Sequence, residues 1–185
     1  MTQDRINPDE GVAVVTGAGS GLGRALTIEL SARGFSVVAI GRRRAALEET
    51  QVMATGAPVH VMALDVGKVD QVADAFAKMR DKHGPVAVLI NNAAVYPRRD
   101  ILEETPSSFM DVVNINLGGL FACSHAVLPD MVDRGRGRIL NVSTFADIAP
   151  LPASAAYSVS KGAARNFDAG LGCGFGRPVS GDCDW

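Results

Sequence analysis

The chain has 185 residues, 47% of them hydrophobic, and a formal net charge of −2. This size and apolar content predict one globular domain with a substantial core, and so small a net charge gives no general attraction for nucleic acid or an anionic membrane. The three cysteines, Cys123, Cys173 and Cys183, form no Cys-x-x-Cys pair, so we expect no disulfide framework, no zinc site and a reducing, cytoplasmic setting.

The N-terminal half alternates short apolar runs with helical patterns. Residues 1–10 form a polar tail without the features of a signal peptide, and no apolar run approaches transmembrane length. The patterns predict strands over Val12–Thr16, Phe35–Ile40 and Val59–Ala63. They predict helices over Leu22–Arg33, Arg43–Ala54 and Val69–Lys82.

The alternation continues to about residue 168. Strands are predicted over Val86–Ile90 and Ile139–Val142, and helices over Phe109–Met131, with Pro106 at the start, and over 155–168. Every second residue from Gly170 to Gly176 is a glycine, and each costs about 1 kcal/mol relative to alanine in a helix. We therefore expect residues 169–185 to be an irregular tail.

These elements predict the fold class. Continuous apolar strands separated by helices are typical of a parallel sheet covered on both faces. Right-handed crossovers then favour a Rossmann-like doubly wound α/β fold with strand order 3-2-1-4-5, in one domain over residues 11–168.

A glycine-rich turn joins the first strand to the first helix. Its glycines let the backbone turn sharply and approach a ligand, and the helix behind it offers free N–H groups and a positive dipole end. A simple turn is the alternative, but the strand-turn-helix context favours a pyrophosphate site. The predicted cofactor-binding residues here are Gly17, Gly19, Ser20, Gly21, Leu22 and Gly23.

The end of the second strand indicates the dinucleotide. Gly41 occupies the position where a carboxylate would bind a ribose 2′-hydroxyl, and Arg42 and Arg43 follow it. Guanidinium groups suit a 2′-phosphate, so we expect NADP(H), with NAD(H) possible. The alternative is a basic run facing solvent. We expect the second basic cluster, Arg134, Arg136 and Arg138, to be a solvated face.

Polar residues also follow the third and fourth strands. Asp65, beside Val66, is placed to accept a hydrogen bond from an adenine amino group, or else to cap the next helix. Asn92 and Ala93 follow the fourth strand, where an asparagine can brace strand ends or contact a ribose. His60, His83 and His125 share no metal-ligand spacing, so we expect surface or strand-end histidines and no metal site.

Tyr157 and Lys161 are the candidate catalytic pair. Their i, i+4 spacing puts a phenol and an ammonium on one helical face. The ammonium stabilises the phenolate, so the tyrosine can exchange protons during hydride transfer at a carbonyl or alcohol. A surface tyrosine beside a solvated lysine is the alternative.

Together these motifs resemble the short-chain dehydrogenase/reductase family, from about residue 11 to about 165. TGAGSGLG has the family's Thr-Gly-x-x-x-Gly-x-Gly form, NNAA is similar to its Asn-Asn-Ala-Gly, and YSVSK to its Tyr-x-x-x-Lys. The resemblance implies NAD(P)-dependent interconversion of carbonyls and alcohols. Tyr157 would be the proton donor or acceptor, Lys161 would hold the nicotinamide ribose, and Asn116 would anchor a proton-relaying water.

One catalytic position departs from the family pattern. The family's serine, thirteen residues before the tyrosine, is Thr144 here. The threonine hydroxyl can still donate to a substrate oxygen. The loop Val95–Leu102, which contains Tyr96, is expected to border the pocket for a small carbonyl or alcohol substrate.

The resemblance leaves two functions open. Family members continue with further strands, and residues 169–185 do not resemble them, so we expect a sheet that lacks the usual last strands. An oxidoreductase is the leading hypothesis, and a truncated, inactive relative that binds nucleotide or a partner is the alternative. The resemblance also implies a homodimer or homotetramer.

Overall fold

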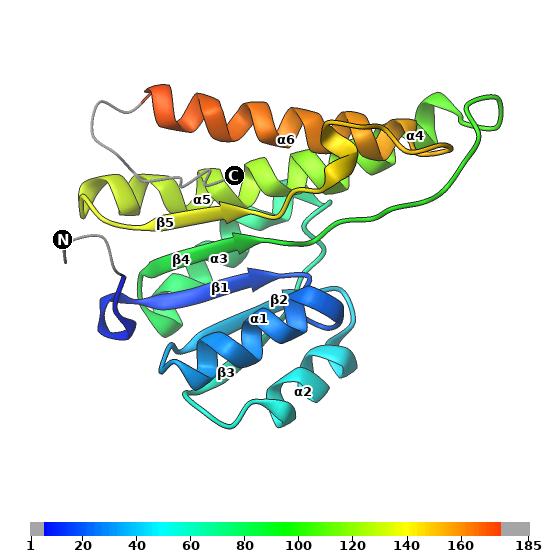
Figure 1. Ribbon diagram of the computed structural model, residues 1–185. Helices are drawn as coiled ribbons and strands as arrows, with labels where there is room; N and C mark the ends of the chain where they lie inside the picture. Colours follow the sequence, from blue (N-terminus) through cyan, green and yellow to red (C-terminus); the bar gives the residue numbers. More distant parts are fainter. Residues whose placement is uncertain (1–5, 175–185) are drawn as a thin grey trace.

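All five predicted strands form one parallel sheet in the computed structural model, which describes residues 6–174 (Figure 1). The order β3-β2-β1-β4-β5 confirms the predicted doubly wound topology. Every residue of β1 is buried, as expected for a strand covered on both faces. The strands are β1 (Val12–Thr16), β2 (Val37–Gly41), β3 (Val59–Ala63), β4 (Val86–Asn91) and β5 (Arg138–Asn141).

Helices cover both faces of the sheet. In Figure 1, α1 (Gly21–Ala32) and α2 (Arg44–Met53) lie in front of it, and α3 (Val69–His83) and α5 (Gly119–Asp133) lie behind it. The last helix, α6 (Ala155–Gly174), lies beyond β5, at the edge opposite β3.

Alternating side chains of the strands divide the interior into two cores. Val15 and Val37 pack with Leu47 of α2 on the front face. Val14 packs with Phe76 of α3 and other apolar side chains on the back face. Successive side chains of a strand point to opposite faces, so one buried strand contributes to both cores.

The predicted long helix Phe109–Met131 consists of three segments. It begins with α4 (Pro106–Val113), where the side chain of Thr105 accepts a hydrogen bond from the backbone N–H of Ser108 at 3.1 Å. A π-helical segment, η2 (Asn114–Gly118), separates α4 from α5. π-Helical turns inside α-helices are frequent at functional sites, and this one carries Asn116.

The continuous helix Pro106–Asp133 is also long and apolar enough to cross a membrane by length and composition, with a mean hydropathy of 1.3. No uninterrupted apolar run in the sequence predicts such a helix. In the fold, Cys123, Val127 and Met131 of α5 are buried in the back core. This part of the apolar surface of the helix therefore belongs to the protein interior.

Helix α6 continues to Gly174, so the prediction of irregular chain from residue 169 is wrong for residues 169–174. Extending a formed helix is easier than starting one, and about 1 kcal/mol per glycine does not stop it. The rest of the predicted tail, 175–185, lies outside the described residues.

The basic residues before β5 are not simply a solvated face. Arg134 donates from Nη2 to the carbonyl oxygen of Val86 at 2.6 Å and pairs with Asp130, with Nε 3.0 Å from Oδ2. Arg136, at the end of the same turn, pairs with Glu10 of the short 3₁₀ helix η1 (Pro8–Glu10). Arg134 therefore connects the end of α5 to β4, and Arg136 connects η1 to the turn before β5.

Candidate functional site

A cavity of about 240 Å³ opens at the carboxyl ends of the parallel strands. Ligands collect at this edge in doubly wound folds. The structure brings there most of the residues predicted to bind a cofactor. The cavity is lined by Gly17, Gly19, Ser20, Gly41, Arg42, Arg43, Ala46, Leu47, Leu64, Asp65, Val66, Asn92, Ala93, Ala94, Val95 and Ile115.

The other predicted turn residues shape the turn without lining the cavity. Gly23 has no room for a side chain, because a Cβ there would lie 2.3 Å from the carbonyl oxygen of Gly17. Gly21 begins α1 with a φ of +51°, and Leu22 is 54% exposed. Among Gly17, Gly21 and Gly23, Gly17 alone has both a positive φ, of +68°, and a place in the cavity lining, where it lies against Asn92.

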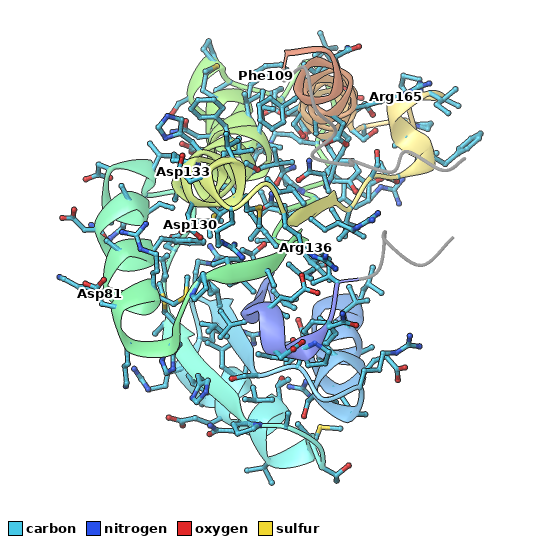
Figure 2. All side chains as sticks on the ribbon, turned by 90° about the vertical axis from the view of Figure 1, so that its left-hand side faces the viewer. Asp81, Phe109, Asp130, Asp133, Arg136 and Arg165 are labelled. Atoms are coloured by element: carbon cyan, nitrogen blue, oxygen red, sulfur yellow. The ribbon has the colours of Figure 1, made fainter. Side chains whose placement is uncertain are left out.

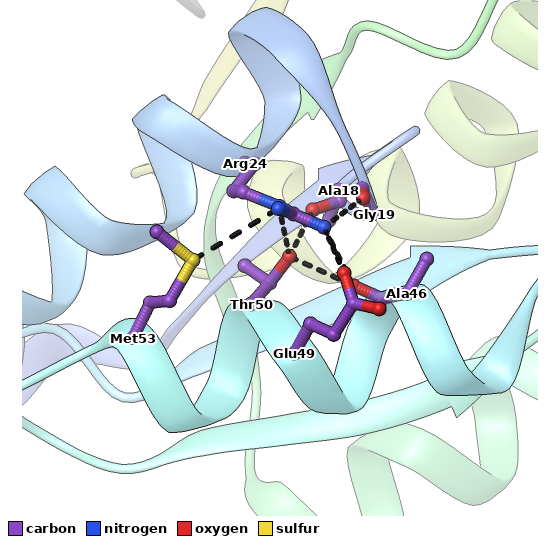
Figure 3. Close-up of polar contacts among 7 residues, drawn as sticks. All are labelled: Ala18, Gly19, Arg24, Ala46, Glu49, Thr50 and Met53. Atoms are coloured by element: carbon purple, nitrogen blue, oxygen red, sulfur yellow. Dashed lines mark hydrogen bonds and ion pairs between the residues drawn. The ribbon is translucent and has the colours of Figure 1, made fainter.

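Arg24 fastens the glycine-rich turn to α2 (Figure 3). Its Nη2 donates to the carbonyl oxygen of Gly19 at 2.7 Å and to Glu49 Oε2 at 2.9 Å, and its Nε donates to Thr50 Oγ1 at 3.0 Å. Thr50 Oγ1 in turn donates to the carbonyl oxygen of Ala18 at 3.0 Å. The turn therefore has a fixed shape.

Sequence reasoning missed Arg24. The available signal was its position in the first turn of a helix, where the dipole disfavours a cation. A basic residue there needs a compensating partner, and Glu49 supplies it.

Asn92 braces two strand ends. Its Nδ2 donates to the carbonyl oxygen of Thr16 at 2.9 Å, and Thr16 Oγ1 accepts from the backbone N–H groups of Asn92 and Ala93, both at 3.0 Å. Of the two roles expected for this asparagine, the structure shows the bracing one.

Asp65 closes a short turn after β3. Its Oδ1 accepts from the backbone N–H of Gly67 at 3.1 Å. The N-cap position of α3 belongs to Lys68, with no side-chain cap. The alternative of Asp65 as helix cap is therefore wrong, and its carboxylate stands at the cavity wall.

Arg42 and Arg43 stand at the end of β2, both on the cavity wall and both exposed. Among the described residues, neither guanidinium forms an ion pair. Gly41 contributes no side chain at the strand end. The rim beside the end of β2 is therefore cationic.

The candidate catalytic residues lie around the ends of β4 and β5. Asn116, 1% exposed, donates from Nδ2 to the carbonyl oxygen of Val95 and to Ser160 Oγ, both at 3.0 Å. Its Oδ1 accepts from the Val95 N–H at 2.8 Å. Asn116 thus joins α6 to Val95, a residue of the cavity wall, and so links the two predicted groups of site residues.

Lys161 is 3% exposed and donates from Nζ to the carbonyl oxygen of Val142 at 2.6 Å. The alternative of a solvated surface lysine is therefore wrong. On the preceding turn of α6, Tyr157 is half-buried, and its ring contacts that of Tyr96 with centroids 4.4 Å apart. Tyr96, from the loop expected to border the substrate pocket, therefore lies against the candidate catalytic tyrosine.

Thr144 follows β5 and caps the 3₁₀ turn η3 (Phe145–Asp147). Its Oγ1 accepts from the backbone N–H of Ala146 at 3.4 Å, which leaves the hydroxyl hydrogen free to donate elsewhere. The neighbouring Ser143 is exposed, whereas Thr144 is half-buried.

A partly buried polar chain supports these strand ends. Asn91 Nδ2 donates to Ser124 Oγ at 3.0 Å and to Asn141 Oδ1 at 2.7 Å, and Asn141 Nδ2 donates to Asp168 Oδ1. Burial raises the pKa of Asp168, and the hydrogen bond from Asn141 lowers it in part. These hydrogen bonds connect β4, β5 and α6, and the sequence did not predict them.

The family assignment rests on the whole domain. The sequence profile of a family described as short chain dehydrogenase matches residues 11–177. The chain belongs to the short-chain dehydrogenase/reductase family. Within residues 6–146 and 148–168, the side chains form no cluster of three or more potential metal ligands.

Several members of this family are similar to the chain. Gluconate 5-dehydrogenase of Gluconobacter oxydans is 33% identical over 167 residues, which cover 89% of this chain and 65% of the relative. Sulfoacetaldehyde reductase of Chromohalobacter salexigens is 36% identical over 162 residues, 86% of this chain and 64% of the relative. The chain thus spans less than two thirds of the length of these two relatives.

A solved member of the family has the same architecture. The crystal structure of a metagenomic short-chain oxidoreductase in complex with NADP has a TM-score of 0.83 and 29% identity. The alignment covers 87% of this chain and 73% of that one.

Proposed function

We propose that the chain is an oxidoreductase that transfers hydride between NADP(H) and a carbonyl or secondary alcohol. The observation that carries this proposal is the buried Lys161 one helical turn from Tyr157, at the same sheet edge as the glycine-lined cavity. The names of the similar relatives, a dehydrogenase and a reductase, support the reaction class.

The cavity residues fit a dinucleotide. Gly17 and Gly19 line the cavity without side chains, and neither position has room for one: a Cβ on Gly17 would lie 2.8 Å from Asn92 Nδ2, and one on Gly19 would lie 3.1 Å from Ala46 Cβ. A pyrophosphate would bind at the turn and the start of α1, where free N–H groups are available. The bound cofactor would supply or accept the hydride at its nicotinamide.

The phosphate preference depends on the end of β2. Arg42 and Arg43 can donate charge-assisted hydrogen bonds to a 2′-phosphate, and Gly41 presents no carboxylate to repel it. We therefore propose NADP(H) as the preferred cofactor, with Asp65 and Val66 beside the adenine. NAD(H) lacks the phosphate and would gain less from this rim.

Three side chains would take part in proton transfer to and from the substrate oxygen. The Tyr157 hydroxyl gives a proton to the substrate oxygen during reduction and takes it back during oxidation. The Lys161 ammonium, held by Val142, stabilises the phenolate and binds the nicotinamide ribose. Thr144 donates its free hydroxyl hydrogen to the substrate oxygen.

Asn116 would position a water molecule and would not itself exchange a proton with the substrate. Both hydrogens of its Nδ2 have protein partners, and Oδ1 accepts from Val95. An amide oxygen has two acceptor sites, so the second one remains for the water that relays protons to Lys161. Tyr96 would border the substrate through its contact with Tyr157.

Steady-state oxidation of NADPH against a panel of aldehydes and ketones tests the proposal. Tyr157→Phe should reduce kcat at least about 100-fold, because the acid/base group is lost, and leave NADPH binding within about threefold. The matched control is Tyr96→Phe, which keeps the ring contact and should retain activity. Equal activity in wild type and Tyr157→Phe, or tight NADPH binding without turnover of any substrate, would contradict the proposal.

A further inference from the structure

A second cavity, of about 290 Å³, lies between α3 and the edge of the sheet at β3. It shares no lining residue with the first cavity. Its walls are Val38, His60, Val61, Met62, Ala63, Ala75, Lys78, Met79, Lys82 and His83. Nothing in the proposed reaction uses these residues.

The fold explains why this space is open. His60 and Met62 of β3 are in register with Val38 and Ile40 of β2, whose side chains face the back core. The side chains of His60 and Met62 therefore point to the same face as α3. Since β3 is an edge strand, no further strand of the described chain lies beyond these two side chains.

The floor of the cavity is apolar and the rim is cationic. Val38 and Met79 are buried members of the back core. Lys78 and Lys82 stand one turn apart on α3 and line the opening. Among the described residues, neither lysine forms an ion pair.

Two histidines add titratable charge. The rings of His60 and His83 lie with centroids 4.1 Å apart, and His60 Nε2 lies 3.1 Å from Ser36 Oγ. Desolvation and the charge of Lys82 lower the pKa of His60, and desolvation, His60 and Lys82 lower the pKa of His83. The sequence did not predict this contact, because the residues belong to different elements.

Among the residues that the structure describes, no carboxylate lines this cavity. The cavity lining contains no Asp or Glu, and Asp81 of α3 points away from the body of the molecule (Figure 2). Four groups that are or can become cationic, Lys78, Lys82, His60 and His83, therefore surround an apolar space without a counter-charge on its walls.

We propose that this cavity binds a small amphipathic anion, a carboxylate on a short hydrocarbon chain. The carboxylate would accept hydrogen bonds from Lys78, Lys82 and the imidazoles, and the chain would lie against Val38 and Met79. At about 30 Å³ per water-sized group, 290 Å³ accommodates roughly ten heavy atoms. Octanoate has this size.

Binding should strengthen as the pH falls. A bound anion stabilises the imidazolium forms of His60 and His83 and so raises their affinity for protons. The same linkage makes protonation favour the anion. Octanoate should therefore bind more tightly at pH 6.0 than at pH 7.5, by about threefold or more.

Isothermal titration calorimetry with octanoate on the full chain tests the site. The double variant Lys78→Gln, Lys82→Gln should weaken binding at least about tenfold, because two charge-assisted contacts are lost. The control Arg80→Gln removes a cation from the same helix away from the cavity and should bind like wild type. Octanol and acetate, which lack the charge or the chain, should each bind at least about tenfold more weakly.

Nuclear magnetic resonance locates the ligand independently. Octanoate should shift the imidazole signals of His60 and His83 and leave that of His125 unchanged. Octanoate binding of equal affinity in wild type and the double lysine variant, or octanol binding as tightly as octanoate, would overturn the proposal. So would millimolar octanoate that produces neither heat nor an imidazole shift.

Discussion

At the scale of single residues, burial decides which interpretation of a motif holds. The spacing of Tyr157 and Lys161 predicts a shared helical face, but it cannot distinguish a solvated lysine from a buried one. The structure buries Lys161 against the end of β5, where Val142 accepts its hydrogen bond. That contact comes from a different element, so no local pattern in the sequence predicts it.

The cationic rim makes a prediction about cofactor choice. Arg42→Asp should weaken NADPH binding at least about tenfold, since a charge-assisted hydrogen bond is lost and a repulsive carboxylate is added. NADH binding should change less than about threefold. Fluorescence titration of both nucleotides measures the difference.

Arg44→Asp is the matched control, because Arg44 lies on α2 outside the cavity lining and pairs with Glu48. Its affinities should match those of wild type. Equal losses of NADPH and NADH affinity in Arg42→Asp would refute the assignment of the 2′-phosphate to this rim.

Arg24 should contribute to the stability of the folded chain through its contacts with the glycine-rich turn and α2. Arg24→Ala leaves Glu49 without its partner and Gly19 without its donor, which should lower the free energy of unfolding by about 1–3 kcal/mol. Urea denaturation measures this loss. Arg33→Ala breaks an exposed pair with Glu29 and should cost less than about 0.5 kcal/mol; equal costs would contradict the anchoring role.

At the scale of elements, the sequence predicts the type and order of strands and helices well, and their interruptions poorly. The apolar pattern of Phe109–Met131 predicts one helix, but tertiary contacts of Asn116 accompany a π-helical segment inside it. At the glycine-rich end of α6 the error is the opposite one: the glycines predict an interruption, but the helix continues to Gly174. Local propensity cannot anticipate either outcome.

The contact between α6 and β5 gives a prediction at Asp168. Its folded pKa is raised, so the ionised carboxylate costs stability at neutral pH, and this cost decreases as the pH falls from the raised pKa toward the pKa of the unfolded chain. Asp168→Asn keeps an acceptor for Asn141 and should be at least as stable as wild type at pH 7.5. Asp168→Ala loses the hydrogen bond from Asn141 and should be about 1 kcal/mol less stable than Asp168→Asn at pH 7.5.

Urea denaturation at pH 7.5 and pH 4.5 checks both variants. The stability of Asp168→Asn relative to wild type should be greater at pH 7.5 than at pH 4.5. A ranking of Asp168→Ala above Asp168→Asn at pH 7.5 would contradict the role given to the hydrogen bond from Asn141.

The contact between His60 of β3 and His83 of α3 predicts that the stability of the folded chain decreases in acid. The pKa values of His60 and His83 are lowered in the fold, so the unfolded chain binds more protons once the pH falls to about 6.5. Stability should therefore decrease between pH 7.5 and pH 5.5. Replacing both with glutamine should reduce that decrease, and His125→Gln should leave it unchanged, as measured by urea midpoints at the two pH values.

At the scale of the whole molecule, the sheet order follows from sequence because few topologies satisfy right-handed crossovers. The cofactor cavity follows too, since the carboxyl ends of parallel strands meet at one edge. What required the structure are contacts between distant segments, such as Arg24 with Glu49 and His60 with His83. Assembly into a dimer or tetramer and a cytoplasmic location stay predictions.

Deuterium transfer tests the central claim most directly. The chain would be incubated with the carbonyl compounds of the panel and NADPH that carries deuterium at both C4 positions of the nicotinamide, and the alcohols would be analysed by mass spectrometry. We predict an alcohol that carries one deuterium on the former carbonyl carbon. NADPH that binds to the chain while none of the compounds yields a deuterated alcohol would contradict the account.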